Sequence, residues 1–179
     1  MEYIALFRGI NVSGQKKIKM ADLKTMLEEI GLQNVVTYIQ SGNIVFSAEE
    51  ENSFVLEEKI KNGIQSTFGF DVPVLILTKP NILQVFNDNP FANEKEIENN
   101  NIYFVLLKDT PEKKMVEALQ KETFKNERFI ISKNCIYLAC FKGYGNAKCN
   151  NNFFEKKLKV SATTRNYKTM QKLVELSNG

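Results

Sequence analysis

Apolar positions follow two different periods along the chain, and their alternation predicts the architecture. Stretches such as "YIALFR" (residues 3–8) and "IYFVLL" (residues 102–107) are short, apolar and rich in branched or aromatic side chains, which is typical of buried strands. In contrast, "ADLKTMLEEIGL" (residues 21–32) has apolar residues at helical spacing and a glycine near its end, which is typical of a helix with a glycine stop.

Residues 1–79 are predicted to form a first subdomain. Its elements in chain order are a strand 3–8, a helix 21–32, two strands within 35–47 about a tight Ser41-Gly42-Asn43 turn, a helix 53–68 and a strand 72–78. The order βαββαβ is typical of a ferredoxin-like, split βαβ unit.

Residues 80–101 are predicted to be a connecting helix and a polar linker, which includes the run "NEKEIENNN". Residues 102–179 are predicted to form the second subdomain. Its elements are a strand 102–107, a helix 111–122, a hairpin of 128–132 and 135–141, a polar helix near 150–158 and a last helix 165–177. The predicted fold class is therefore α+β: a ferredoxin-like first subdomain followed by a smaller α+β subdomain of order βαββαα.

The composition indicates a cytoplasmic globular protein. No apolar run approaches the roughly 18 residues of a membrane span, and the first residues do not have the pattern of a signal peptide. Three cysteines, without a CxxC pair, favour reduced structural thiols over a disulfide framework. We therefore expect no membrane partner.

Histidine is absent, which excludes nucleophile systems and metal sites that need an imidazole. An oxygen-ligated magnesium site stays open, but the acidic residues form no known loop motif. We predict no cofactor and no metal.

Positive charge gathers in two segments. Residues 8–19 carry Arg8 and three lysines with no acidic side chain, a net charge of +4, and residues 142–168 carry a net charge of +6. The residues between them have 12 basic and 18 acidic side chains. The two segments either form one anion-attracting face or are a chance clustering on a solvated surface.

The predicted topology places two loops at one end of the first sheet. The first and second strands should be parallel, so the loop that follows the first strand should lie beside the turn that follows the second. The polar residues expected to converge there are Arg8, Asn11, Ser13, Lys16, Gln40, Ser41 and Asn43. The alternative is that these glycines, asparagines and serines only form the turns.

"GINVSGQKK" (residues 9–17) narrows the kind of anion site. It resembles the P-loop pattern GxxxxGK[ST], but Gln15 separates Gly14 from Lys16 and no hydroxyl residue follows that lysine. A nucleotide triphosphatase is therefore disfavoured. A different anion site, formed by backbone amides and lysines, stays open.

"ATTRNYKTMQKL" (residues 162–173) suggests a second contribution. Thr163 or Thr164 is predicted to cap the last helix, which would put Arg165 in its first turn, where the helix dipole disfavours a cation. A bound anion would offset that cost, and an exposed, salt-screened turn is the alternative.

Three motifs, "LFRGINVSG", "TYIQSGNIVF" and "ATTRNYKTMQKLVEL", resemble the bacterial family of uncharacterised proteins DUF1697 and its SP0830-like fold. The resemblance implies a two-part α+β fold with a ferredoxin-like first part, and it implies no activity. Its motif positions include Thr164, Arg165 and Asn166.

The sequence therefore predicts a binding protein for an anionic ligand: a nucleotide, a nucleic acid or a phosphorylated metabolite. The predicted ligand-binding residues are Arg8, Asn11, Ser13, Lys16, Gln40, Ser41, Asn43, Arg165 and Asn166. One alternative is an enzyme for a small anionic substrate, with Ser41 as nucleophile and Lys16 as base, or with Arg8 and Arg165 as charge stabilisers. Another is a protein-interaction module.

Overall fold

The computed structural model describes residues 1–50, 52–91, 95, 97 and 101–178. By its internal contacts the chain divides into two compact units, the first comprising Met1–Leu83 with Leu173–Gly179 and the second Gln84–Lys172. The sequence prediction divides the chain at 79 and 101 instead. Most of the polar run 93–101 lies outside the described residues.

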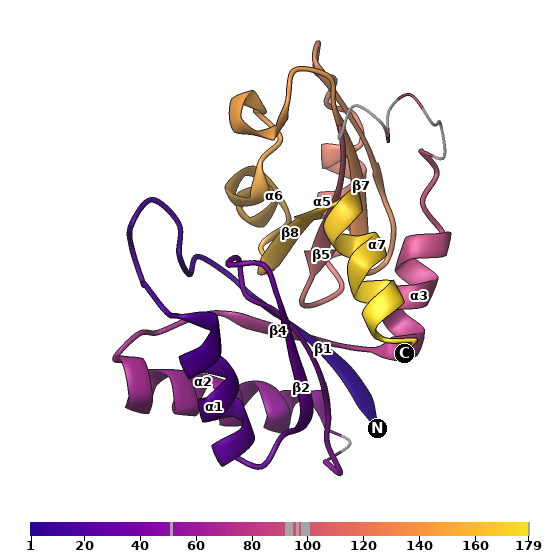
Figure 1. Cartoon of the computed structure of the whole chain (residues 1–179). Coiled ribbons are helices and arrows are strands. Elements are labelled where there is room, and N and C mark those ends of the chain that lie inside the picture. The colour runs from indigo at the N-terminus through magenta and orange to yellow at the C-terminus, as the bar shows by residue number, and fades with distance from the viewer. Residues whose placement is uncertain (51, 92–94, 96, 98–100, 179) are drawn as a thin grey trace. The chain divides into compact units, whose positions relative to one another are not determined.

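The first unit has a four-stranded antiparallel sheet with two helices on one of its faces (Figure 1). Its elements are β1 (Glu2–Phe7), α1 (Met20–Glu29), β2 (Gln33–Tyr38), β3 (Asn43–Ser47), α2 (Ser53–Phe68) and β4 (Val74–Thr78), followed by α3 (Lys79–Asn87). The strand order is β2-β3-β1-β4. Because β3 is antiparallel to both β1 and β2, those two strands are parallel, which confirms the predicted split βαβ arrangement.

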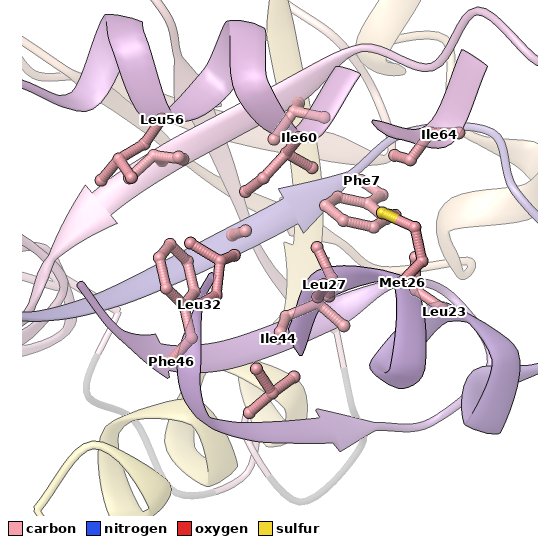
Figure 2. Packing of buried hydrophobic residues seen from close by; sticks show 14 of the residues in the cluster. Phe7, Leu23, Met26, Leu27, Leu32, Ile44, Phe46, Leu56, Ile60 and Ile64 are labelled. Atoms are coloured by element: carbon pink, nitrogen blue, oxygen red, sulfur yellow. The ribbon is translucent and has the colours of Figure 1, made fainter. Parts of the chain in front are cut away.

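The core of this unit follows from the two periods in the sequence. Alternate residues of β1 (Tyr3, Ala5 and Phe7) face the helices, as strand geometry requires. Each helix contributes a stripe of apolar residues at three- and four-residue spacing, which Figure 2 shows meeting over the sheet: Leu23, Met26 and Leu27 from α1, and Leu56, Ile60 and Ile64 from α2.

The second unit has the same topology as the first. Its elements are β5 (Ile102–Leu107), α5 (Lys113–Leu119), β6 (Glu127–Ile131), β7 (Cys135–Cys140), a 3₁₀ turn (Tyr144–Asn146), α6 (Asn151–Leu158) and β8 (Ala162–Asn166), followed by α7 (Tyr167–Leu176). The strand order β6-β7-β5-β8 repeats that of the first sheet. The fold is thus α+β with two four-stranded antiparallel sheets.

The strand β8 corrects the sequence prediction, which began the last helix at Arg165 and gave this subdomain the order βαββαα. Residues 162–166 instead pair with β5 along their whole length, and Arg165 lies opposite Phe104. The β-branched Thr163 and Thr164 suit an extended strand. The helix begins one residue after the strand ends, at Tyr167.

The two units also have equivalent backbone hydrogen bonds at the end of the first strand of each sheet. In the first, the Phe7 amide donates to the Gly42 carbonyl at 2.8 Å, and in the second the Leu107 amide donates to the Asn134 carbonyl at 2.9 Å. The chain that follows differs. Twelve residues, 8–19, connect β1 to α1, whereas five residues, 108–112, connect β5 to α5.

Among the described residues, no helix combines the length and the apolar character that crossing a bilayer requires.

Candidate anion-binding site

The loop 8–19 and the turn 39–42 lie together at one end of the first sheet, as predicted. Leu6 is the register partner of Asn43, and the amide of Phe7 bonds the carbonyl of Gly42. Arg8 then leaves the strand with its own amide on the Pro73 carbonyl, at 3.0 Å. The polar residues predicted to converge from 8–16 and 40–43 therefore share one end of the molecule's first unit.

Asn11 joins the loop to the turn. Its Nδ2 donates to the carbonyl of Ile18 at 2.8 Å and to the carbonyl of Gln40 at 2.9 Å, and its Oδ1 accepts from the Ile18 amide at 2.8 Å. Asn11 has a φ of 54°, a left-handed conformation that asparagine tolerates better than most residues. These three hydrogen bonds hold the loop in place, so Asn11 acts in the scaffold.

Residues 12–15 form a tight turn at the tip of the loop. The Gln15 amide donates to the Val12 carbonyl at 2.9 Å, and both central residues have positive φ, 50° at Ser13 and 77° at Gly14. Positive φ at both central positions is the signature of a type I′ turn. Ser13 is exposed at this tip.

The turn 39–42 is held by side chains that the sequence prediction assigned to a ligand. Asn43 is the first residue of β3 and is fully buried, so it does not lie in the exposed turn as predicted. Its Nδ2 donates to the Tyr38 carbonyl at 3.1 Å and to Ser41 Oγ at 2.9 Å. Gln40 is exposed, and its carbonyl accepts from Asn11.

Gly42 allows the turn to approach the loop closely. It has a φ of 75°, and a Cβ atom at this position would lie 2.7 Å from both Ile10 Cδ1 and Phe7 Cβ. Ile39, at the other end of the turn, is exposed and has a φ of 50°. A positive φ is unusual for a β-branched residue. Nothing in the sequence indicated this backbone conformation.

The positive charges of the loop divide into two groups. Lys16 is partly buried and its ammonium group donates to the carbonyl of Asp71, which ties it to the scaffold. Lys17 and Lys19 are exposed. The predicted site residues did not include these two lysines. Both contribute to the net charge of the segment 8–19, so the charge pattern is the sequence signal that could have identified them.

Arg165 and Asn166 belong to β8 in the second unit. The Arg165 Nη1 donates to the Thr164 carbonyl at 2.9 Å, and burial lowers the pKa of Arg165 to about 10, so the side chain stays protonated near neutral pH. The predicted placement in a helical first turn is wrong, because the residue lies in a strand. That the two basic segments form one site stays a prediction.

The cap of the last helix is Asn166 rather than a threonine. Its Oδ1 accepts from the Thr169 amide at 2.8 Å, the hydrogen bond of an N-cap residue. Thr164 instead donates to Asn151 Oδ1 at 2.9 Å. Asn166 thus has a structural role that the sequence prediction assigned to its neighbours.

The side chains of the predicted nucleophile and base each make a hydrogen bond within the fold. The Lys16 ammonium group donates to the main-chain carbonyl of Asp71, and Ser41 Oγ accepts from Asn43 Nδ2. All three cysteines are buried and form no disulfide, and burial raises the pKa of Cys140 and Cys149 to about 12, so they stay protonated thiols. Within the described residues, no group of three or more cysteine or acidic side chains could hold a metal ion.

Comparisons with known proteins agree on the fold. The conserved bacterial protein SP0830 from Streptococcus pneumoniae is similar in structure over 98% of both chains, with a TM-score of 0.74 and 22% sequence identity. No curated protein matches the sequence. The model of a family described as a protein of unknown function, DUF1697, matches residues 1–137, which include the loop 8–19 and the turn 39–42. The chain belongs to the DUF1697 family.

Proposed function

We propose that the first unit binds a phosphate-bearing, anionic ligand at the end of its sheet where the loop 8–19 meets the turn 39–42. One observation carries the proposal: a long loop with a net charge of +4 is held by the hydrogen bonds of Asn11 while Lys17 and Lys19 remain exposed. A loop that is already ordered loses less conformational entropy when it binds. Exposed ammonium groups are suited to phosphate oxygens.

The second unit provides an internal comparison. Its equivalent connection, residues 108–112, follows a strand that ends with the equivalent backbone hydrogen bond. This connection has one basic residue, Lys108, and two acidic residues, Asp109 and Glu112, which gives a net charge of −1. The topology alone therefore does not require a basic loop at this position. The added length and charge in the first unit support a function beyond folding.

Nucleotides, nucleic acids and phosphorylated metabolites share the chemistry that this loop would recognise. The exposure of Ser13, Lys17 and Lys19 favours a ligand that presents several phosphates along a surface, because small ligands are usually enclosed in a pocket. The three buried cysteines, which form no disulfide, support a cytoplasmic location.

A thermal-shift series tests this proposal. The probes are inorganic phosphate, ATP, a 12-nucleotide RNA, the DNA of the same sequence, and adenosine as the phosphate-free control. We expect at least one phosphate-bearing probe to raise the melting temperature at 50 mM KCl, and the shift to fall at 300 mM KCl. Adenosine should have no effect.

The pattern among the probes separates the sources of phosphate. Stabilisation by ATP without stabilisation by the oligonucleotides would indicate a nucleotide or metabolite site, and the reverse would indicate nucleic acid. If no phosphate-bearing probe shifts the melting temperature, or if adenosine matches ATP, the proposed function is wrong.

A further inference from the structure

The second unit contains a cavity of about 460 Å³ beside β6, which is an edge strand of its sheet. All five residues of β6, Glu127–Ile131, line this cavity, together with residues of the preceding loop. Its volume lies in the range of roughly 300 to 1,000 Å³ that is typical of small-molecule sites.

The two faces of β6 give the cavity walls different chemistry. Glu127, Phe129 and Ile131 alternate with Arg128 and Ile130, so they lie on opposite faces of the strand. Phe129 and Ile131 pack against the hydrophobic cluster of the second unit. The Arg128 guanidinium lies over the Phe91 ring, 4.8 Å from its centroid. The wall on the side of Glu127 therefore combines a carboxylate with aromatic side chains.

Glu127 is a buried carboxylate, with 8% of its surface exposed. Its Oε1 accepts a hydrogen bond from the Lys148 amide at 3.1 Å. A carboxylate has about four acceptor positions, and within the described part of the chain its donor is the neutral Lys148 amide, which leaves capacity for another partner. Burial of a carboxylate is costly unless charge or hydrogen bonds compensate for it, and a cation in the cavity would do so.

Aromatic rings form the adjoining wall. Phe124 and Phe129 both line the cavity, with their ring centroids 6.0 Å apart. Ring faces attract cations through their quadrupole.

The protein uses the same combination of groups next to this cavity. The Lys157 ammonium pairs with the carboxylate of Glu122, which also lines the cavity, and lies 5.5 Å from the centroid of Phe153. Phe153 in turn packs edge-on against Phe124, with centroids 5.5 Å apart. An ammonium group paired with a carboxylate beside a phenyl ring therefore already occurs in this part of the fold.

We propose that this cavity binds a small organic ammonium ion, with Glu127 as its counter-charge and Phe124 and Phe129 as its aromatic walls. The site shares no residue with the loop 8–19 and takes a ligand of opposite charge. Its test is therefore independent of the proposed function.

Choline and its neutral, isosteric analogue 3,3-dimethylbutan-1-ol test the proposal directly. Both are titrated into the ¹⁵N-labelled full chain, and amide shifts of residues 120–131 are followed. We expect choline to bind saturably and at least tenfold more tightly than the alcohol, because only choline provides the positive charge. Equal affinity, or no saturable choline-dependent shift in this segment, would overturn the proposal.

Two variants test whether Glu127 provides the counter-charge for choline. Glu127→Gln keeps an acceptor for the Lys148 amide and removes the charge, so choline affinity should fall at least fivefold with little change in alcohol binding. Glu117→Gln, at an exposed acidic residue of α5, is the matched control and should bind choline like the wild type. Unchanged choline affinity in Glu127→Gln would contradict the assignment. If that variant does not fold, the wild-type comparison of choline with the alcohol still decides.

Discussion

At the scale of single residues, the polar side chains of the candidate site have two different roles. Asn11 holds the loop 8–19 against the turn 39–42 by donating to the Ile18 and Gln40 carbonyls, and Asn43 holds the turn itself by donating to Ser41 Oγ and to the Tyr38 carbonyl. Lys17 and Lys19 are exposed on the loop that these hydrogen bonds hold. Substitutions in the first group should therefore change stability, and substitutions in the second should change binding.

Gly42→Ala should be strongly destabilising. An added methyl group would lie 2.7 Å from Phe7 and Ile10, and alanine is also disfavoured at a φ of 75°. We expect a loss of about 2 to 4 kcal/mol in the free energy of unfolding, measured by urea denaturation.

Gly14→Ala is the matched control for Gly42→Ala. Gly14 has nearly the same φ, 77°, but a methyl group added there would have Lys17 Cε as its nearest neighbour, 3.9 Å away. It should lose only the conformational term, about 1 kcal/mol. Equal losses in the two variants would show that close packing of the turn against the loop does not matter.

Asn11→Gly tests the link between the loop and the turn. Glycine accepts the φ of 54° but removes all three side-chain hydrogen bonds, so we expect a loss of about 2 to 3 kcal/mol. Ser13→Gly, at a φ of 50° on the exposed tip, should stay within about 0.5 kcal/mol of the wild type. A similar melting temperature for both variants would show that the side chain of Asn11 does not stabilise the loop.

At the scale of elements, the strand β8 includes two residues, Arg165 and Asn166, that the sequence pattern places at the start of the last helix. The boundary between strand and helix falls at Asn166, which is both the last residue of β8 and the cap of α7. The sequence "ATTRN" has little apolar periodicity of its own, and its pairing partner β5 lies about 60 residues earlier in the chain. Its strand conformation is therefore set by long-range pairing.

Asn166→Ala should weaken the start of α7. Loss of the side-chain acceptor for the Thr169 amide is expected to cost about 0.5 to 2 kcal/mol, whereas Asn166→Asp keeps an acceptor and should be tolerated. Urea denaturation of the two variants checks this. A capping role for Asn166 is excluded if alanine and aspartate have the same effect.

The first unit could be predicted almost completely, because its strands and helices have strong local periods and its topology follows from their order. The convergence of residues 8–16 with 40–43 also followed, since β1 and β2 had to be parallel. The separation of scaffold residues from exposed ones could not be predicted. It depends on hydrogen bonds from Asn11 and Asn43 to carbonyls whose positions are set by left-handed residues such as Ile39.

At the scale of the whole molecule, the chain repeats one topology twice and varies the connection after the first strand of each unit. The longer, basic connection of the first unit and the short connection of the second, with its net charge of −1, start from equivalent hydrogen bonds. The cavity beside β6, whose lining includes Glu122, Glu127 and Arg128, is the site proposed for the second unit. The two units of the same fold are thus proposed to take ligands of opposite charge.

The most direct test of the central claim is the affinity for phosphate-bearing probes of two charge-matched double variants. Lys17→Gln with Lys19→Gln removes the exposed charges of the loop, and Lys113→Gln with Lys114→Gln removes two exposed charges of α5. The probes are fluorescently labelled ATP and a labelled 12-nucleotide RNA, each titrated at 50 to 300 mM KCl.

We predict that the loop variant binds at least one probe about tenfold more weakly than the wild type, equivalent to about 1.4 kcal/mol, while the α5 variant stays within about twofold. For the RNA, the slope of log affinity against log salt should also become shallower by about 1.4, or 0.7 for each lost phosphate contact. Equal weakening in both variants would mean a diffuse basic surface, and would contradict a phosphate site on the loop 8–19.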